Sequence, residues 1–167
     1  MGLDMYMHRY NKVTCPHCGK EIVGVGEGEE VAYWRKANAI HKWFEDHCAN
    51  GELENCEDYP VTKDQLIELR NTCEKVLNSS KIVNKLVKER RYDFEAKDYK
   101  EVEICANVLD DPSVAEEILP TQSGFFFGGT MYDEGYVEDL KYTIKKINEI
   151  LEETDFEHSE ITYYAWW

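Results

Sequence analysis

The chain begins with Met1-Gly-Leu-Asp-Met-Tyr-Met-His8, in which apolar residues occupy the odd positions and Gly2, Asp4, Tyr6 and His8 the even ones. Alternation with a period of two is typical of a strand that buries one face. At the far end of the chain, Ile161-Thr-Tyr-Tyr-Ala-Trp-Trp167 is β-branched and aromatic, a composition that favours strands. We therefore predict two terminal strands that lie in one small sheet.

Helical periodicity and end signals predict four helices between these strands. They are expected at residues 29–48, 62–78, 111–119 and 132–153. Thr62 and Gln65 form the signature of a capping box, and Asp111-Pro112 is typical of an N-cap followed by the first helical residue. Residues 79–108 allow either a helix or an irregular hairpin. The prediction is a helix-rich α+β fold in a single domain, residues 1–167.

The composition indicates one core and no membrane span. The chain has 167 residues, 43% of them hydrophobic, but its apolar stretches are far shorter than the roughly 20 residues that a spanning helix needs. The N-terminus lacks the basic and apolar segments of a secretion signal. We expect a soluble protein of the cytoplasm, in which the six cysteines are thiols or metal ligands rather than disulfides.

The net charge of −15 is concentrated in the second half, because residues 91–167 carry 6 Lys/Arg against 19 Asp/Glu. Such a field repels phosphate backbones, so binding of nucleic acid through a basic surface is disfavoured. The acidity suits a solubility surface or a mimic of nucleic acid. The aromatic content of 13% exceeds what a charged scaffold requires, which favours a ligand pocket.

Cys15-Pro-His-Cys18-Gly19 is the strongest local motif, because a Cys-x-x-Cys turn followed by glycine lets two thiolates share one metal ion. We expect a knuckle at the tip of a hairpin spanning residues 11–28, with a turn between Gly24 and Gly28. A structural zinc needs further ligands, and the candidates are His17, His47, Cys48 and Cys56. The set chosen is Cys15, Cys18, His47 and Cys48. A thiol oxidoreductase motif and two unremarkable reduced cysteines are the alternatives.

Ligand-binding residues are expected first on the predicted helix at residues 29–48. There Trp34, Asn38 and His41 fall on one stripe, flanked by Arg35, and could recognise an anion or a nucleobase by stacking and hydrogen bonding. His41 is also a candidate general base. The alternative is that His41 and Asn38 are partly buried and satisfied by nearby backbone.

A second group of candidates lies in Leu119-Pro-Thr-Gln-Ser-Gly-Phe-Phe-Phe-Gly-Gly-Thr-Met-Tyr132, where polar side chains meet three consecutive phenylalanines. Gln122, Ser123 and Phe126 are expected to face the pocket, and at least two of the phenylalanines to pack in the core. The segment lacks the lysine and the spacing of a phosphate-binding loop. Asp4, Tyr6 and Tyr132 complete the predicted site.

Five segments together resemble a family of small phage and prophage proteins of bacteria: residues 1–6, 33–44, 119–129 and 132–134, and the aromatic C-terminus. The resemblance covers most of the chain outside residues 8–28 and 79–108, and it brings no catalytic residues to carry over. It implies that the Cys-x-x-Cys segment varies among relatives. It also implies an accessory role in a bacterial host, such as counter-defence.

The function predicted is therefore non-catalytic binding of a small, nucleotide-like ligand, for instance an immune signal that the protein sequesters. The first alternative is a phosphodiesterase or nucleotide hydrolase that uses His41 as base or acid, with Arg35 stabilising negative charge. The second is an acidic protein-interaction or DNA-mimic module. The sequence leaves a homo-oligomer open.

Overall fold

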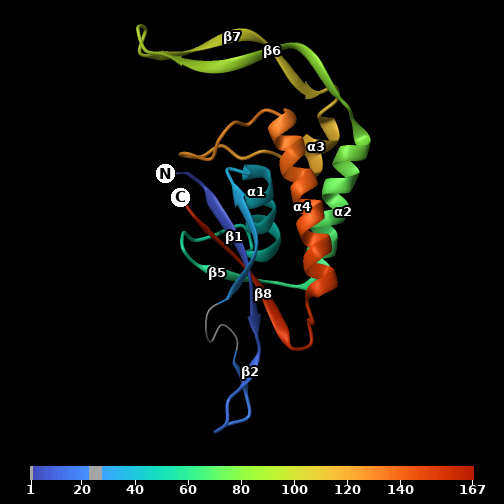
Figure 1. Cartoon of the computed structure of the whole chain (residues 1–167). Coiled ribbons are helices and arrows are strands. Elements are labelled where there is room, and N and C mark those ends of the chain that lie inside the picture. The colour runs from blue at the N-terminus through green and yellow to red at the C-terminus, as the bar shows by residue number, and fades with distance from the viewer. Residues whose placement is uncertain (1, 23–27) are drawn as a thin grey trace.

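The computed structural model describes residues 2–22 and 28–167 and has an α+β fold built on a four-stranded antiparallel sheet (Figure 1). The strand order is β4 (Glu29–Arg35), β1 (Asp4–Asn11), β8 (Ser159–Trp166), β5 (Asp58–Val61). The central pair β1 and β8 runs in register from Asp4 opposite Trp166 to Asn11 opposite Ser159. The predicted terminal strands and their common sheet are confirmed. Met1 and most of the glycine turn predicted at residues 24–28 lie outside the described residues.

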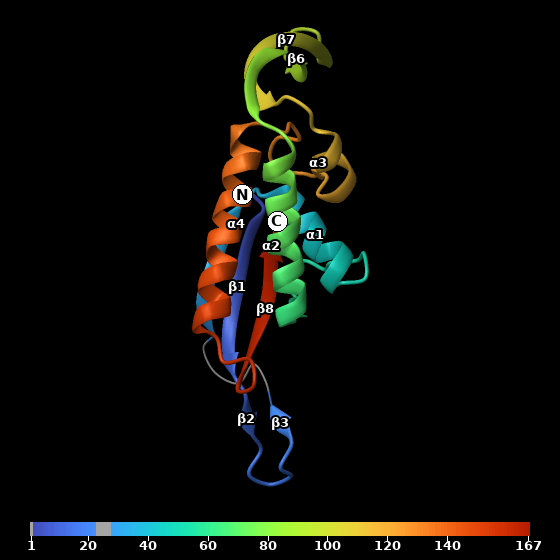
Figure 2. The same cartoon turned by 90° about the vertical axis from the view of Figure 1, so that its right-hand side faces the viewer.

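Three helices cover one face of this sheet: α1 (Asn38–Cys48), α2 (Lys63–Ser79) and α4 (Glu134–Glu153) (Figures 1 and 2). Met5 and Met7 of β1, and Leu3 just before it, are fully buried beneath the helices, as the alternation predicts. They share the core with Tyr163 of β8 and Phe44 of α1, whose rings stack 4.0 Å apart. The opposite face of the sheet therefore carries the even positions of β1.

The helix predicted at residues 29–48 is wrong over its first part, which forms the strand β4. In β4, Ala32 and Trp34 are buried while Tyr33 and Arg35 are exposed, a period of two rather than 3.6. Lys36 then adopts a positive φ of 62°, which turns the chain into α1. Pairing with β1 supplies the hydrogen bonds that stabilise this segment as a strand.

The other helices agree with their predictions to within a few residues. The capping box of Thr62 and Gln65 is present at the start of α2. At α3 (Ser113–Ile118) the N-cap is Pro112, one residue later than predicted, and no side chain caps the helix, although the Asp111 carboxylate accepts a hydrogen bond from Ser113 N at 3.0 Å. At α4 the Asp133 carboxylate accepts one from Tyr136 N at 3.1 Å.

Two hairpins project from opposite ends of the body (Figure 1). The longer one, called the arm, consists of β6 (Ile82–Asp93) and β7 (Asp98–Leu109), and it decides residues 79–108 in favour of a hairpin. The shorter one pairs β2 (Val13–Thr14) with β3 (Glu21–Ile22) and carries the Cys-x-x-Cys turn.

Among the helices of the described chain, none has the length and apolar character needed to cross a membrane.

Candidate ligand-binding face of the sheet

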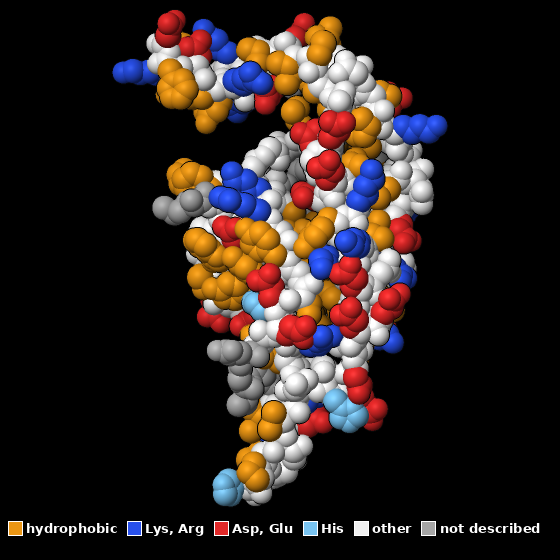
Figure 3. Space-filling view, in the orientation of Figure 1, with side chains coloured by type: hydrophobic (Ala, Val, Ile, Leu, Met, Phe, Trp, Pro, Cys, Tyr) orange, Lys and Arg blue, Asp and Glu red, His pale blue; other side chains and the backbone are white. Residues whose placement is uncertain are grey.

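Among residues 2–22 and 28–167, no helix covers the face of the sheet opposite α1, α2 and α4, and this uncovered face carries a row of aromatic side chains. Because the helices occupy the other face, the even residues of β1 and their cross-strand partners point away from the core (Figures 1 and 2). We call the following residues the aromatic face: Tyr6, His8, Tyr33, Tyr164 and Trp166. Tyr33 and Trp166 are 36% and 38% exposed, and the other three are half-buried. In Figure 3, apolar side chains gather over this part of the molecule, next to basic and acidic ones.

Tyr6 lies at the centre of the aromatic face. The register places it opposite Tyr33 on one side and Tyr164 on the other, and the ring centroids lie 5.0 Å and 6.1 Å away. His8, two residues along the same strand, is nearly parallel to the Tyr6 ring at 6.0 Å. Four rings thus form one continuous surface that can accept a flat ligand by stacking.

Polar groups lie at one end of this surface. The Tyr33 hydroxyl donates a hydrogen bond to Asp4 Oδ1, and this bond, more than burial, raises the pKa of Tyr33 to about 12. Arg35 Nε lies 3.9 Å from the same carboxylate oxygen, while the Arg35 side chain is 59% exposed. The guanidinium therefore keeps donors free for an anionic group.

Arg35 also lines a cavity of about 330 Å³ between the start of α1, the loop at residues 121–131 and the first turns of α4. Lys36 lies on the same wall, and Asp133, Glu138 and Asp139 lie on the opposite one. Burial, followed by the charges of Asp133 and Glu138, raises the pKa of Asp139 to about 7. The cavity thus combines two cations with acidic groups, one of which titrates near neutrality.

A larger hollow of about 770 Å³ lies beside α1, α2 and α3 and is less suited to an anion. Its walls carry four carboxylates, Asp46, Asp64, Glu68 and Glu117, against the single lysine Lys75. Such a surface repels phosphate. The aromatic face with its adjoining cavity is therefore the better candidate site.

The stripe of Trp34, Asn38 and His41 predicted on one helix does not exist, because Trp34 belongs to β4 and α1 begins at Asn38. Trp34 is buried, and its indole N–H donates to Thr143 Oγ1 at 2.9 Å. Asn38 Nδ2 donates to the carbonyls of Phe127 at 3.1 Å and Gly129 at 2.8 Å. Asn38 Oδ1 accepts from Gln122 N at 3.1 Å. The side chains of Trp34 and Asn38 therefore stabilise the fold through these hydrogen bonds.

His41 is 2% exposed and packs among aromatic rings. Its Nδ1 is hydrogen-bonded to the Tyr163 hydroxyl at 2.8 Å, and the rings of Trp167 and Phe127 lie 5.1 Å and 5.3 Å away. Burial, with a smaller contribution from Lys42, lowers the pKa of His41 to about 4. The imidazole is therefore neutral near pH 7 and fixed in the core, which argues against a role as general base.

The loop at residues 121–131 differs from its prediction, because only Phe127 of the three phenylalanines is buried. Phe126 has a positive φ of 67°, and its carbonyl accepts a hydrogen bond from Leu3 N, so the chain turns instead of forming a strand. Phe125 and Phe126 are 81% and 42% exposed, and Ser123 is exposed beside them. The expectation that two phenylalanines pack in the core is wrong.

Two further candidates in this region have structural partners. Gln122 Nε2 donates to Glu45 Oε2 at 2.9 Å, and the Tyr132 hydroxyl accepts from Thr121 N at 3.3 Å. Of the predicted ligand-binding residues, only Asp4, Tyr6 and Arg35 come together on the uncovered face. The prediction missed His8, Tyr33, Tyr164 and Trp166, although the alternation that selects Tyr6 also selects His8.

The four predicted metal ligands are not gathered. Cys15 and Cys18 lie on the β2–β3 hairpin, whereas His47 and Cys48 end α1. His47 stacks on Trp43 at 4.2 Å, and burial raises the pKa of Cys48 to about 12. The prediction fails because the hairpin extends away from the body that contains α1 (Figure 1).

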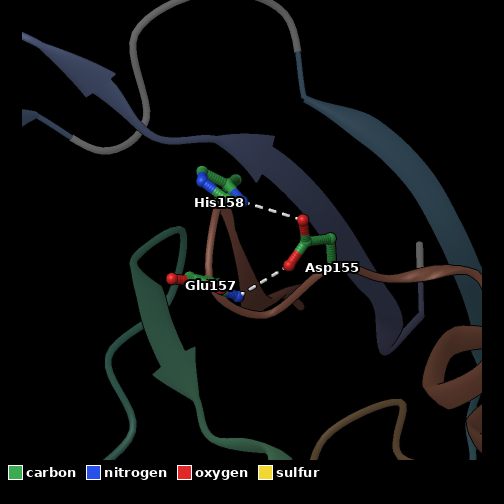
Figure 4. Close-up of side chains that lie close together, drawn as sticks. All are labelled: Asp155, Glu157 and His158. Carbon is green, nitrogen blue, oxygen red and sulfur yellow. Dashed lines mark hydrogen bonds and ion pairs between the residues drawn. The ribbon is translucent and has the colours of Figure 1, made fainter.

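In the described ranges, 2–22 and 28–167, the only group of three close metal-binding side chains is Asp155, Glu157 and His158 (Figure 4). All three are exposed. Asp155 accepts hydrogen bonds from His158 Nδ1 at 2.8 Å and from the Glu157 backbone N–H at 3.0 Å. These bonds close the turn before β8 and account for the cluster without a metal.

Comparison of the chain with models of protein families, with curated proteins and with solved structures finds no match. The function is therefore inferred from the geometry of the site.

Proposed function

We propose that the protein binds a small, nucleotide-like ligand by stacking its ring on the aromatic face, and that it sequesters the ligand without converting it. The observation that carries the proposal is the position of Tyr6, whose ring is flanked by Tyr33, Tyr164 and His8 on the uncovered side of the sheet. Stacking of a base on an aromatic side chain contributes about 1–3 kcal/mol, so two or three such contacts support useful affinity.

The charged groups beside the rings favour a small nucleotide over a strand of nucleic acid. Arg35 and Lys36 offer cations for one phosphate or a few. The overall charge of −15 opposes a long polyanion. The resemblance to phage proteins makes cyclic nucleotides of a bacterial cytoplasm the first ligands to test.

Sequestration is favoured over turnover because the candidate base His41 is buried, neutral and bonded to Tyr163. A phosphodiesterase that used His41 would need to bring this side chain out of the core. Recovery of intact ligand after denaturing the complex supports sequestration, whereas steady loss of the ligand, abolished in His41→Gln, supports the enzyme.

The test is isothermal titration of the purified chain with AMP, cyclic dinucleotides, cyclic trinucleotides and cyclic ADP-ribose isomers. We expect at least one of them to bind, with Tyr6→Phe retaining affinity and Tyr6→Leu losing about tenfold or more, because leucine fills space but has no ring to stack. Phe125→Leu, which changes an exposed ring of the loop, is the control and should bind like wild type. Binding by none of the ligands, or equal binding by Tyr6→Leu, contradicts the proposal.

Protein interaction is a second candidate function, and the arm is the observation that favours it. Leu86, Phe94 and Tyr99 on the arm are 67%, 85% and 54% exposed. Residues 82–109 carry 6 Lys/Arg against 6 Asp/Glu, so the arm does not continue the acidic surface expected of a DNA mimic. If the arm binds a partner protein, shortening it abolishes that binding and leaves binding of nucleotides unchanged.

A further inference from the structure

Two backbone hydrogen bonds close the turn at Cys15–Cys18. Gly19, with a φ of 69°, donates its N–H to the Cys15 carbonyl at 2.9 Å. The backbone N–H of Cys15 donates to the Lys20 carbonyl at 2.8 Å. A tight Cys-x-x-Cys turn of this kind lets two thiolates share one metal ion.

The motif opens no helix, since a short strand lies on each side of the turn. A thiol oxidoreductase places its Cys-x-x-Cys at the start of a helix, so the metal knuckle is the better interpretation. A tetrahedral zinc site needs four ligands, however, and the knuckle supplies two. Within residues 2–22 and 28–167, neither cysteine belongs to a cluster of three or more potential ligands.

The hairpin reaches beyond the sheet (Figure 2). Cys18 is exposed and lies in the turn between β2 and β3. Residues 12–20 contain two lysines and no acidic residue, in a chain whose net charge is −15. The acidic surface of each copy is therefore kept away from the tip, and the lysines oppose the net charge of −2 that four thiolates around one Zn²⁺ carry.

We infer that Cys15 and Cys18 are half of a zinc site that a second copy of the chain completes. Two knuckles related by a two-fold axis present four thiolates to one Zn²⁺, with the tetrahedral geometry that a structural zinc adopts. Each of the four thiols releases its proton as the Zn–S bond forms, and no electron is transferred. The inference does not rest on the proposed ligand site, which lies on the face of the sheet.

The other cysteines do not provide an equivalent pair. Cys73 is buried in the core, and burial raises the pKa of both Cys48 and Cys73 to about 12. Cys56 and Cys105 are exposed but lie apart, one before β5 and the other on the arm. They supply a matched control, because two exposed thiols can be removed without touching the knuckle.

The test is native mass spectrometry of the full chain, reduced, freed of metal and then titrated with Zn²⁺. We expect one zinc per two chains, present only in the dimer, and return to the monomer on chelation with EDTA. The double variant Cys15→Ser, Cys18→Ser should stay monomeric and take up no zinc, with its melting temperature near that of the metal-free wild type. Cys56→Ser, Cys105→Ser should dimerise with zinc as wild type does.

Replacement of Zn²⁺ by Co²⁺ reports the ligands directly, because a site of four thiolates gives strong sulfur-to-cobalt charge-transfer bands and tetrahedral d–d bands. One metal per monomer, metal uptake that survives loss of both cysteines, or a dimer insensitive to EDTA would overturn the inference. So would absence of zinc uptake, or a Co²⁺ spectrum of mixed nitrogen and sulfur ligation.

Discussion

Asn38 fastens the loop at residues 121–131 to the first turn of α1 through three hydrogen bonds. His41, one turn further along the helix, is enclosed by Tyr163, Phe127 and Trp167. Both residues are polar, and a sequence does not distinguish a polar side chain that recognises a ligand from one that satisfies buried backbone. Only the position of α1 beneath the sheet and loop assigns them to the fold.

Replacement of Asn38 by alanine should lower the free energy of unfolding by about 2 kcal/mol, because it leaves buried backbone groups of the loop without partners. Urea denaturation monitored by tryptophan fluorescence measures the loss. Ser123→Ala, at an exposed position of the same loop, is the control and should stay within about 0.5 kcal/mol of wild type. Equal stability of the two variants would refute the structural role of Asn38.

His41 should make stability depend on pH. Its pKa falls from the ordinary 6.5 to about 4 on folding, so between these values the unfolded chain binds a proton that the folded chain does not. The unfolded chain is stabilised by this proton as the pH falls, so the folded chain is most stable with respect to His41 above pH 6.5 and loses stability as the pH falls toward 4. Between pH 7.5 and 5.0 the decline should amount to roughly 2 kcal/mol.

The matched variant for this prediction is His41→Gln, whose unfolding free energy should fall less steeply than that of wild type over the same interval. Other titrating groups, Asp139 included, act on both proteins and cancel in the comparison. Parallel profiles of the two proteins would show that His41 is not buried in its neutral form.

Asp139 should make stability depend on pH in the opposite direction to His41. Burial raises its pKa from 3.8 to about 7, so the folded chain binds the extra proton and gains stability as the pH falls from 7 toward 3.8. Asp139→Asn, which resembles the protonated acid, should therefore be more stable than wild type at pH 8. The difference should shrink at pH 5, as thermal melts at both pH values can measure. A variant less stable than wild type at pH 8 contradicts the assignment.

At the scale of elements, the arm contacts the body mainly at its base. Leu109 N donates to the Tyr132 carbonyl at 2.8 Å, and Val108 forms a bridge with Asp133. Beyond this base, β6 and β7 pair chiefly with each other. Interactions within a projecting hairpin do not involve the core, so they add little to the stability of the core.

Replacement of residues 86–105 by a short Asn-Gly turn should accordingly change the free energy of unfolding by about 1 kcal/mol or less. Circular dichroism melts of the shortened and full chains provide the measurement. Unfolding of the shortened chain would mean that the arm is part of the core.

The elements that the sequence predicts well are those with clear local signals. Alternation defines β1, and the capping box of Thr62 defines the start of α2. The boundary between β4 and α1 is hidden because Lys36 has a positive φ without a glycine or proline to announce it. Aromatic pairs lie on both sides of this boundary, Tyr33-Trp34 and Trp43-Phe44, at spacings that fit one continuous helix.

The aromatic face could be predicted only in part, for a different reason. Alternation places Tyr6 and His8 on one side of β1, but their neighbours depend on pairing across the sheet. Tyr33 and Tyr164 become partners of Tyr6 through the registers of β1 with β4 and β8. The periodicity of a single segment does not specify these registers.

At the scale of the whole molecule, three helices on one face of the sheet leave the aromatic face uncovered, and the hairpins extend from the two ends (Figures 1 and 2). Each proposed activity therefore has a separate region. The aromatic face binds the ligand, the knuckle binds zinc together with a second copy of the chain, and the arm binds a partner protein. A ligand stacked on the aromatic face should perturb the strands that form it.

Two-dimensional NMR of the isotope-labelled protein, titrated with AMP, cyclic dinucleotides, cyclic trinucleotides and cyclic ADP-ribose isomers, locates the bound ligand. We expect the nucleotide that binds to cause chemical-shift changes concentrated on Tyr6, His8, Tyr33, Arg35 and Tyr164. Shifts confined to the hollow beside α2, or no shifts on the outer face of β1, β4 and β8 with any of these nucleotides, would contradict stacking on the aromatic face.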